Sequence, residues 1–212
     1  MVEDIIVETL REIGYLLSAT FIPLATLIVG RKVLREKKST GQYNIIRLII
    51  FGIFFCFAMM SVFEYLVELS WFSGEIFGYN ISSINLYSIL IGTMVSLGLS
   101  LVFYANRWEA FYYISIFIFS GMVIFYFLTG YSAWIEWYIQ IAAVLCLAFM
   151  YFTSFRIKDN GTLGLTIFFT LAFSTLVLEL SLINQIIIII YNIFILILSL
   201  GFFKPFKEEV RE

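Results

Sequence analysis

Of the 212 residues, 62% are hydrophobic and 13% are charged, whereas water-soluble domains are roughly 45–50% apolar and 25% charged. The formal net charge is −2 and histidine is absent, which excludes histidine-based acid–base catalysis and histidine-ligated metal sites. We therefore expect an integral membrane protein that is not an enzyme, with no cofactor, no metal site and no nucleic-acid partner.

Long apolar stretches recur along the chain, and about 20 such residues suffice to cross the roughly 30 Å hydrocarbon core of a bilayer. Residues 160–203 would form a helix of roughly 66 Å, about twice that thickness, so the chain must turn back near Ser181 to Gln185. The sequence thus predicts an all-α bundle of seven transmembrane helices, near residues 13–30, 43–69, 83–105, 109–129, 133–153, 161–182 and 184–203.

The segments outside these spans are short. Residues 1–12 mix acidic and aliphatic side chains, which indicates a short amphipathic lead-in to the first span. Residues 31–42 are predicted as a loop, and residues 204–212 as a short tail. A single transmembrane domain, residues 13–203, is therefore expected.

Basic residues fall on alternate connections between the spans. Cytoplasmic loops carry an excess of lysine and arginine, so this pattern predicts an N-terminus outside the cell membrane and a cytoplasmic C-terminus. Arg11 alone lies on the predicted outer side. The predicted cytoplasmic bases are Arg31, Lys32, Arg35, Lys37, Lys38, Arg47, Arg107, Arg156, Lys158, Lys204, Lys207 and Arg211.

Several carboxylates lie within the predicted spans, near their outer ends. Glu64 and Glu68 are one helical turn apart, Glu136 is followed one turn later by Gln140, and Glu179 lies near the outer end of the sixth span. Ionisable groups in spans usually face the bundle interior or a water-filled cavity. One hypothesis is that these residues converge on an outward-facing acidic pocket for a cation or a small ligand; the other is that they only meet headgroups or water.

The seventh span carries Gln185, Asn192 and Ser199 at intervals of seven residues, which places them on one helix face. This polar seam either bonds to a neighbouring helix or lines the lower part of the predicted pocket.

Small residues recur every four positions along the third span. Such spacing lets helix backbones approach closely, so the third span is predicted to be a central packing element. The residues concerned are Ser88, Gly92, Ser96 and Ser100.

The basic segment Arg31–Lys38 is followed by a helix that ends Phe63-Glu64-Tyr65-Leu66-Val67-Glu68-Leu69. Over less than a third of the chain, this pattern is loosely similar to the seven-helix input modules of sensor kinases. The resemblance implies a sensor whose basic segment contacts another protein, because no kinase domain is attached here. The same segment could instead hold anionic lipid headgroups.

Three classes of function fit these features. The first is a sensor or receptor-like binding module, the second a small cation- or proton-coupled transporter or channel, and the third an accessory subunit of a membrane complex. A cavity that continues past Asn192 towards the cytoplasm would favour transport. A closed lower half below an acidic outer pocket would favour sensing.

Overall fold

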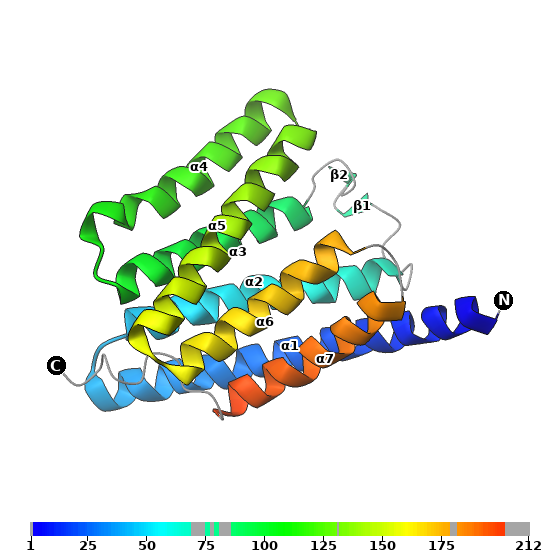
Figure 1. Cartoon of the computed structure of the whole chain (residues 1–212), viewed down its shortest axis with the longest axis horizontal. Helices are drawn as coiled ribbons and strands as arrows, with labels where there is room; N and C mark the ends of the chain where they lie inside the picture. The colour runs from blue at the N-terminus through cyan, green and yellow to red at the C-terminus, as the bar shows by residue number, and fades with distance from the viewer. Residues whose placement is uncertain are drawn as a thin grey trace.

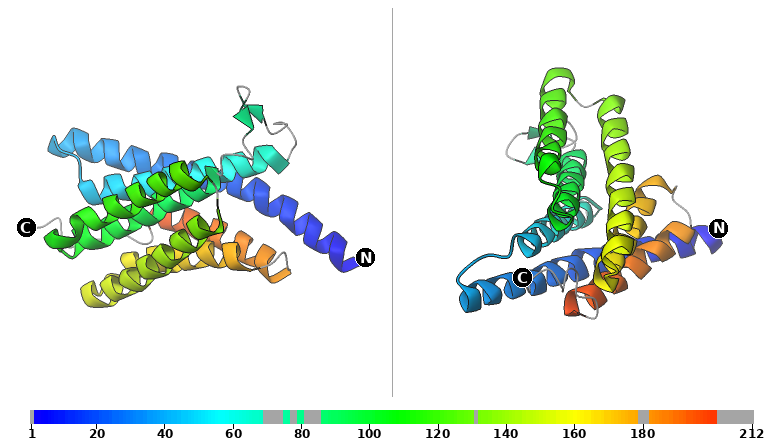
Figure 2. Two further views of the ribbon diagram at one scale, coloured as in Figure 1. Left: turned by 90° about the horizontal axis from the view of Figure 1, so that it is seen from above. Right: turned by 60° about the vertical axis from the view of Figure 1, so that its left-hand side comes forward.

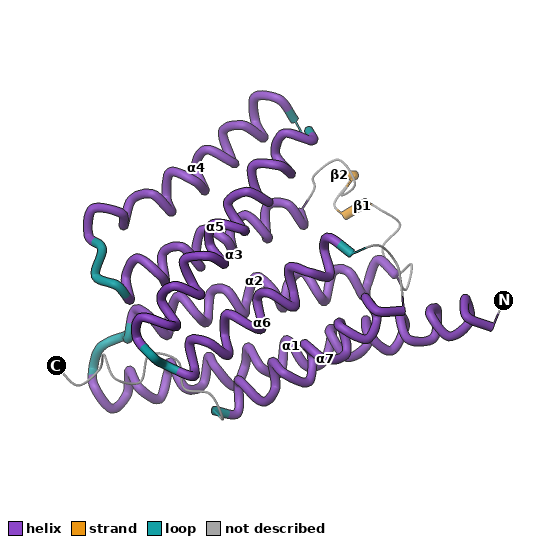
Figure 3. Tube along the Cα trace, in the orientation of Figure 1, coloured by secondary structure: helices purple, strands orange, loops and turns teal. Residues whose placement is uncertain are grey.

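The computed structural model describes residues 2–68, 75–76, 79–80, 86–130, 132–178 and 182–201. Within these residues the chain folds into α helices joined by short connections (Figures 1 and 3). Two-residue strands, β1 (Glu75–Ile76) and β2 (Tyr79–Asn80), pair antiparallel between α2 and α3, and a 3-10 helix, Glu109–Phe111, precedes α4. The helices are α1 (Val2–Thr40), α2 (Ile45–Glu68), α3 (Leu86–Ala105), α4 (Tyr112–Thr129), α5 (Ala133–Ile157), α6 (Asn160–Val177) and α7 (Leu182–Leu200).

Six of these helices form a ring, and α4 lies outside it. Each ring helix packs against its neighbour in the order α1, α2, α3, α5, α6 and α7, and the contact between α7 and α1 closes the ring. Helix α4 packs mainly against α3 and more sparsely against α5, so it projects from the body of the bundle (Figure 2). Large side chains from several ring helices, among them Phe54, Leu99 and Phe168, are almost completely buried in the core.

The outer surface of the bundle is strongly apolar. Among the described residues, six helices are long and apolar enough to cross a membrane, within α1, α2, α3, α4 together with its 3-10 turn, α5 and α7. Large apolar side chains such as Phe117 and Phe127 of α4 are exposed on this surface, at 72% and 81% of their area. The predicted α-helical membrane bundle is therefore confirmed.

Helix α1 is much longer than the sequence pattern predicts. Its 39 residues run without interruption from Val2 to Thr40. Residues 2–12 therefore continue directly into the first span, and the predicted loop at residues 31–42 is wrong for residues 31–40. Arginine, lysine, leucine and glutamate favour helix strongly, and the helix ends only before Gly41, whose φ of 77° is readily adopted by glycine. At about 1.5 Å per residue, α1 is roughly 58 Å long and extends well beyond a bilayer core.

The predicted division of residues 160–203 into two helices is confirmed. Helix α6 ends at Val177 and α7 begins at Leu182, so the chain turns a few residues earlier than predicted and Gln185 already belongs to α7. Leu178, the last described residue before the turn, has extended backbone angles that end α6. The predicted tail, residues 204–212, lies outside the described residues.

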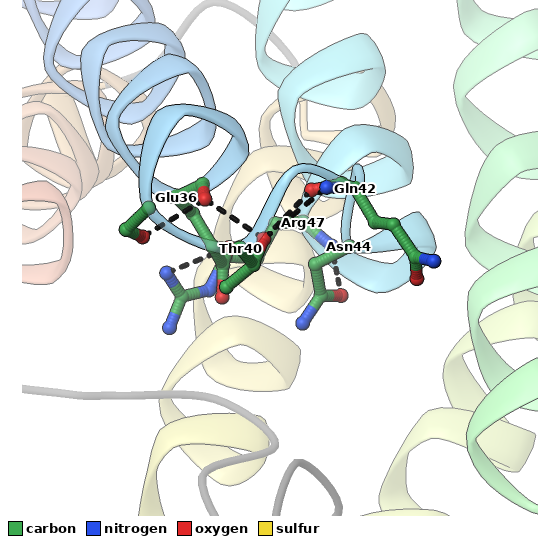
Figure 4. A network of polar contacts seen from close by, with 6 residues as sticks. Glu36, Thr40, Gln42, Asn44 and Arg47 are labelled. Atoms are coloured by element: carbon green, nitrogen blue, oxygen red, sulfur yellow. Dashed lines mark hydrogen bonds and ion pairs between the residues drawn. The ribbon is translucent and has the colours of Figure 1, made fainter.

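Side chains also define the short connection between α1 and α2 (Figure 4). Glu36 and Arg47 form an ion pair of 3.0 Å between the two helices. The hydroxyl of Thr40 donates hydrogen bonds to the carbonyls of Glu36 and Gln42. Asn44 Oδ1 accepts a 3.3 Å hydrogen bond from the backbone N–H of Arg47, which is the usual cap at a helix N-terminus.

Asp159 caps α6 in the same way. Its carboxylate accepts hydrogen bonds from the backbone N–H groups of Gly161, at 3.3 Å, and Thr162, at 3.0 Å. We expect Asp159→Ala to lower the free energy of unfolding by about 1 kcal/mol, because these N–H groups lose their acceptor. Unfolding in detergent micelles measures the change. Asp159→Asn keeps the capping oxygen and should retain most of the stability; an equal loss in both variants would contradict the capping role.

Candidate functional site

A cavity of about 400 Å³ lies inside the helix ring. All six ring helices contribute to its lining, and α4 does not. This volume falls within the usual range for small-molecule sites, about 300–1,000 Å³. The lining residues are Tyr15, Ser18, Phe57, Met60, Glu64, Ile91, Met94, Val95, Gly98, Ala143, Cys146, Leu147, Met150, Phe169, Ala172, Phe173, Thr175, Leu178, Asn184, Gln185, Ile188 and Tyr191.

The lining is polar at one end and apolar at the other. Polar side chains gather near the end of α2 and the turn from α6 to α7, together with Tyr15 of α1: Tyr15, Glu64, Thr175, Asn184 and Gln185. We call this the acidic end of the bundle, and the opposite end, where α1 and α7 end, the basic end. Deeper towards the basic end, most lining side chains are apolar. The cavity therefore suits a ligand with one polar group and an apolar body.

Hydrogen bonds join α7 to α1 beside the cavity. Asn192 is completely buried and donates hydrogen bonds from Nδ2 to the hydroxyl of Ser18, at 2.7 Å, and to the carbonyl of Ile188, at 2.9 Å. The Tyr191 hydroxyl shares a 3.3 Å hydrogen bond with the same Ser18 hydroxyl. A methyl group placed on Gly14 would come within 3.0 Å of Ile188 Cγ2, so the two helices are in close contact here.

The polar seam predicted on the seventh span divides between the two roles. Gln185 lines the cavity, whereas Asn192 lies outside the lining and bonds to α1. The hydroxyl of Ser199 bonds to the Leu196 carbonyl of its own helix, and the Ser199 carbonyl accepts a hydrogen bond from Lys32 Nζ. Of the three seam side chains, Asn192 therefore joins α7 to α1, Gln185 lines the cavity and Ser199 bonds within α7.

Aromatic rings close the cavity towards the basic end. Phe168 stacks on Phe54 with ring centres 6.0 Å apart, meets Phe57 edge-on at 5.5 Å and contacts Tyr191 at 6.2 Å. Ile195, one turn below Tyr191, is fully buried. Within the described residues, the lining does not continue past Asn192.

Of the predicted acidic residues, Glu64 lies in the lining of the cavity. The side chains of Glu68 and Glu179 lie outside the described residues, so their convergence with Glu64 stays a prediction.

Glu136 and Gln140 do not join the cavity, which corrects their predicted place in the pocket. Both are exposed on the first turns of α5. Ile135 and Ile139, on another face of these turns, pack against Met122 of α4. Helix α5 diverges from α6 towards its N-terminus (Figures 1 and 2), so its first turns lie beyond the ring.

The ladder of small residues on α3 faces α4. The hydroxyls of Ser96 and Ser100 donate hydrogen bonds to the carbonyl and the hydroxyl of Ser115, at 2.5 and 2.7 Å. A methyl group placed on Gly92 would collide with Met122 Sδ. Ser88 lines a separate apolar pocket, which is shared with residues of α4 and α5. The ladder therefore holds α4 onto the ring and contributes nothing to the polar end of the cavity.

The contribution of α1 to the cavity was not predicted from the sequence. Tyr15 and Ser18 both line the cavity, and Gly14 and Ser18 are four residues apart. This is the small-residue spacing that marks close helix contacts in membranes, and it was recognised only in the third span. The signal was therefore present in the sequence.

Among the described residues, no group of three cysteine or acidic side chains could hold a metal ion. Comparison of the chain with protein-family models, with curated proteins and with solved structures finds no match.

Proposed function

We propose that the protein is a sensor or receptor-like binding module of the cell membrane, which crosses the bilayer seven times and takes a cation or small ligand into its cavity. The observation that carries this proposal is a cavity enclosed by six helices, polar at the acidic end and closed by aromatic rings towards the basic end. Such a cavity suits a bound ligand that enters and leaves by the same end.

The distribution of charge supports an orientation with the N-terminus outside. The described basic residues apart from Arg11 belong to segments near the basic end of the bundle (Figure 1). Lysine and arginine concentrate on the cytoplasmic side of membrane proteins, so we assign the basic end to the cytoplasm. These residues are Arg31, Lys32, Arg35, Lys37, Lys38, Arg47, Arg107, Arg156 and Lys158.

The closed lower half favours binding over transport. A transporter or channel needs a path past Asn192, and Phe54, Phe57 and Phe168 fill the corresponding level of the bundle. An accessory subunit needs no internal cavity, whereas about 400 Å³ of space with clustered polar groups suits a ligand.

We propose that the sensor passes its signal to a partner through the basic end of α1. Arg31, Arg35 and Lys38 are exposed there, on a helical extension that a protein partner or anionic headgroups could contact. The hydrogen bonds of Ser18 with Asn192 and of Lys32 with the Ser199 carbonyl join α1 to α7 along its length. A shift of α7 at the cavity would therefore move α1.

Cys146 allows a test of access, because it lines the cavity. In vesicles carrying the Cys56→Ser protein, a small cationic methanethiosulfonate that cannot cross the bilayer should modify Cys146 only from the side of the acidic end. Modification from both sides would indicate a transport path and overturn the sensor proposal. No modification from either side would overturn the accessible cavity.

A matched control separates the cavity from the lipid surface. Ala148 lies on the same helix as Cys146 but is exposed on the outside of the bundle. In a chain without the two native cysteines, Ala148→Cys should resist the same charged reagent, because the reagent does not enter the hydrocarbon core.

A further inference from the structure

The charged side chain that lines the cavity is acidic. Among the described lining residues, Glu64 is the charged one, and no lysine or arginine lines the cavity. A carboxylate accepts hydrogen bonds and donates none when ionised. A ligand group placed against Glu64 therefore gains most if it is positively charged and carries N–H donors.

A second acceptor belongs to the lining of the same cavity. Gln185 lines the same polar end, is 2% exposed, and its Oε1 is buried without a hydrogen-bond partner among the described residues. A buried acceptor left unpaired is unfavourable. Because the terminal torsion of glutamine is soft, the amide can turn to present this oxygen to a donor in the cavity.

The remainder of the cavity suits an apolar body. Met60, Met94 and Met150 reach it from α2, α3 and α5, and Phe169 and Phe173 from α6. Methionine side chains adapt to irregular shapes and make favourable contacts with aromatic rings. An inorganic cation would bind only among the oxygen-bearing side chains of the polar end and would leave this apolar volume unoccupied, so an organic cation fits the lining better.

We propose that the ligand is a small organic ammonium compound, with its N–H groups on the Glu64 carboxylate and Gln185 Oε1 and its apolar body among the methionine and phenylalanine side chains. This inference rests on the proposed function and names the ligand class. An anionic ligand of the same shape would be repelled by Glu64, and a neutral one would lack the Coulomb attraction between an ammonium group and the carboxylate.

The test uses three water-soluble probes of similar shape on the protein in lipid nanodiscs: 2-phenylethylammonium, 2-phenylethanol and 3-phenylpropanoate. We expect the ammonium to bind at least tenfold more tightly than the alcohol, and the carboxylate not to bind. Glu64→Gln should weaken ammonium binding at least tenfold and leave alcohol binding unchanged. Glu136→Gln, a change at an exposed position of α5, should alter neither affinity.

A second variant tests the amide. Gln185→Met keeps a side chain of similar length without the amide oxygen, so it should weaken ammonium binding while Cys146 stays accessible from the acidic end. Equal affinity for ammonium and alcohol, unchanged affinity in Glu64→Gln, or binding of none of the probes would each overturn the ammonium proposal. The proposed binding function is tested separately by the labelling of Cys146. It fails if Cys146 is modified from both sides of the bilayer or from neither side.

Discussion

Replacing Ala143 with phenylalanine is expected to weaken ligand binding strongly while leaving the protein folded. Ala143 lines the cavity from α5 and is 5% exposed. Because Ala143 lines the cavity, the added phenyl ring would project into it and occupy the volume that the ligand needs. We expect the affinity for 2-phenylethylammonium to fall at least tenfold, as measured by equilibrium binding in nanodiscs.

The same substitution on the outer face of α5 provides the control. Ala148 is exposed, so Ala148→Phe adds its ring towards lipid and should leave the affinity unchanged. Thermal unfolding of both variants shows whether either one loses the fold. Unchanged binding in a folded Ala143→Phe protein would place the ligand elsewhere.

Removing the ring of Phe168 is expected to cause the largest loss of stability among the changes considered. Phe168 is 1% exposed and contacts Phe54, Phe57 and Tyr191. Phe→Ala costs about 3–5 kcal/mol in water-soluble cores. Between membrane helices the hydrophobic driving force is absent and packing remains, so we expect a loss of roughly 2 kcal/mol for Phe168→Ala.

Unfolding in detergent micelles measures this change, with Phe117→Ala as the comparison. Phe117 of α4 is 72% exposed, so its removal leaves no internal space and should change the free energy of unfolding by less than about 0.5 kcal/mol. An equal loss of unfolding free energy in the two variants would show that the aromatic cluster at Phe168 is not tightly packed below the cavity.

The helices could be predicted because length and apolar composition alone identify membrane spans. The ends of the helices could be predicted less accurately than the helices themselves. Residues 31–40 are mostly polar, and a polar segment between two apolar spans suggests a loop. Lysine, arginine and glutamate are nevertheless good helix formers, and α1 ends only before Gly41. The place of α4 outside the ring also escaped prediction, because it depends on which helices pack together.

The candidate site could be predicted in part. Glu64 and Gln185 were identified because polar groups are rare in apolar spans, and both line the cavity. Glu136 and Gln140 are also polar residues within a predicted span, but the divergence of α5 from α6 leaves them exposed. Helix tilt decides which side of a span meets the interior, and tilt depends on packing rather than on residue spacing.

Because contact between α1 and α7 closes the ring, the cavity can form only late in the synthesis of the chain. The hydrogen bond between Ser18 and Asn192 joins residues 174 positions apart. Earlier spans can enter the bilayer one after another, yet the wall of the cavity stays open until α7 has been synthesised and has reached α1. A compound that occupies the closed cavity binds only the assembled protein, and it should therefore raise the yield of correctly folded chains during expression.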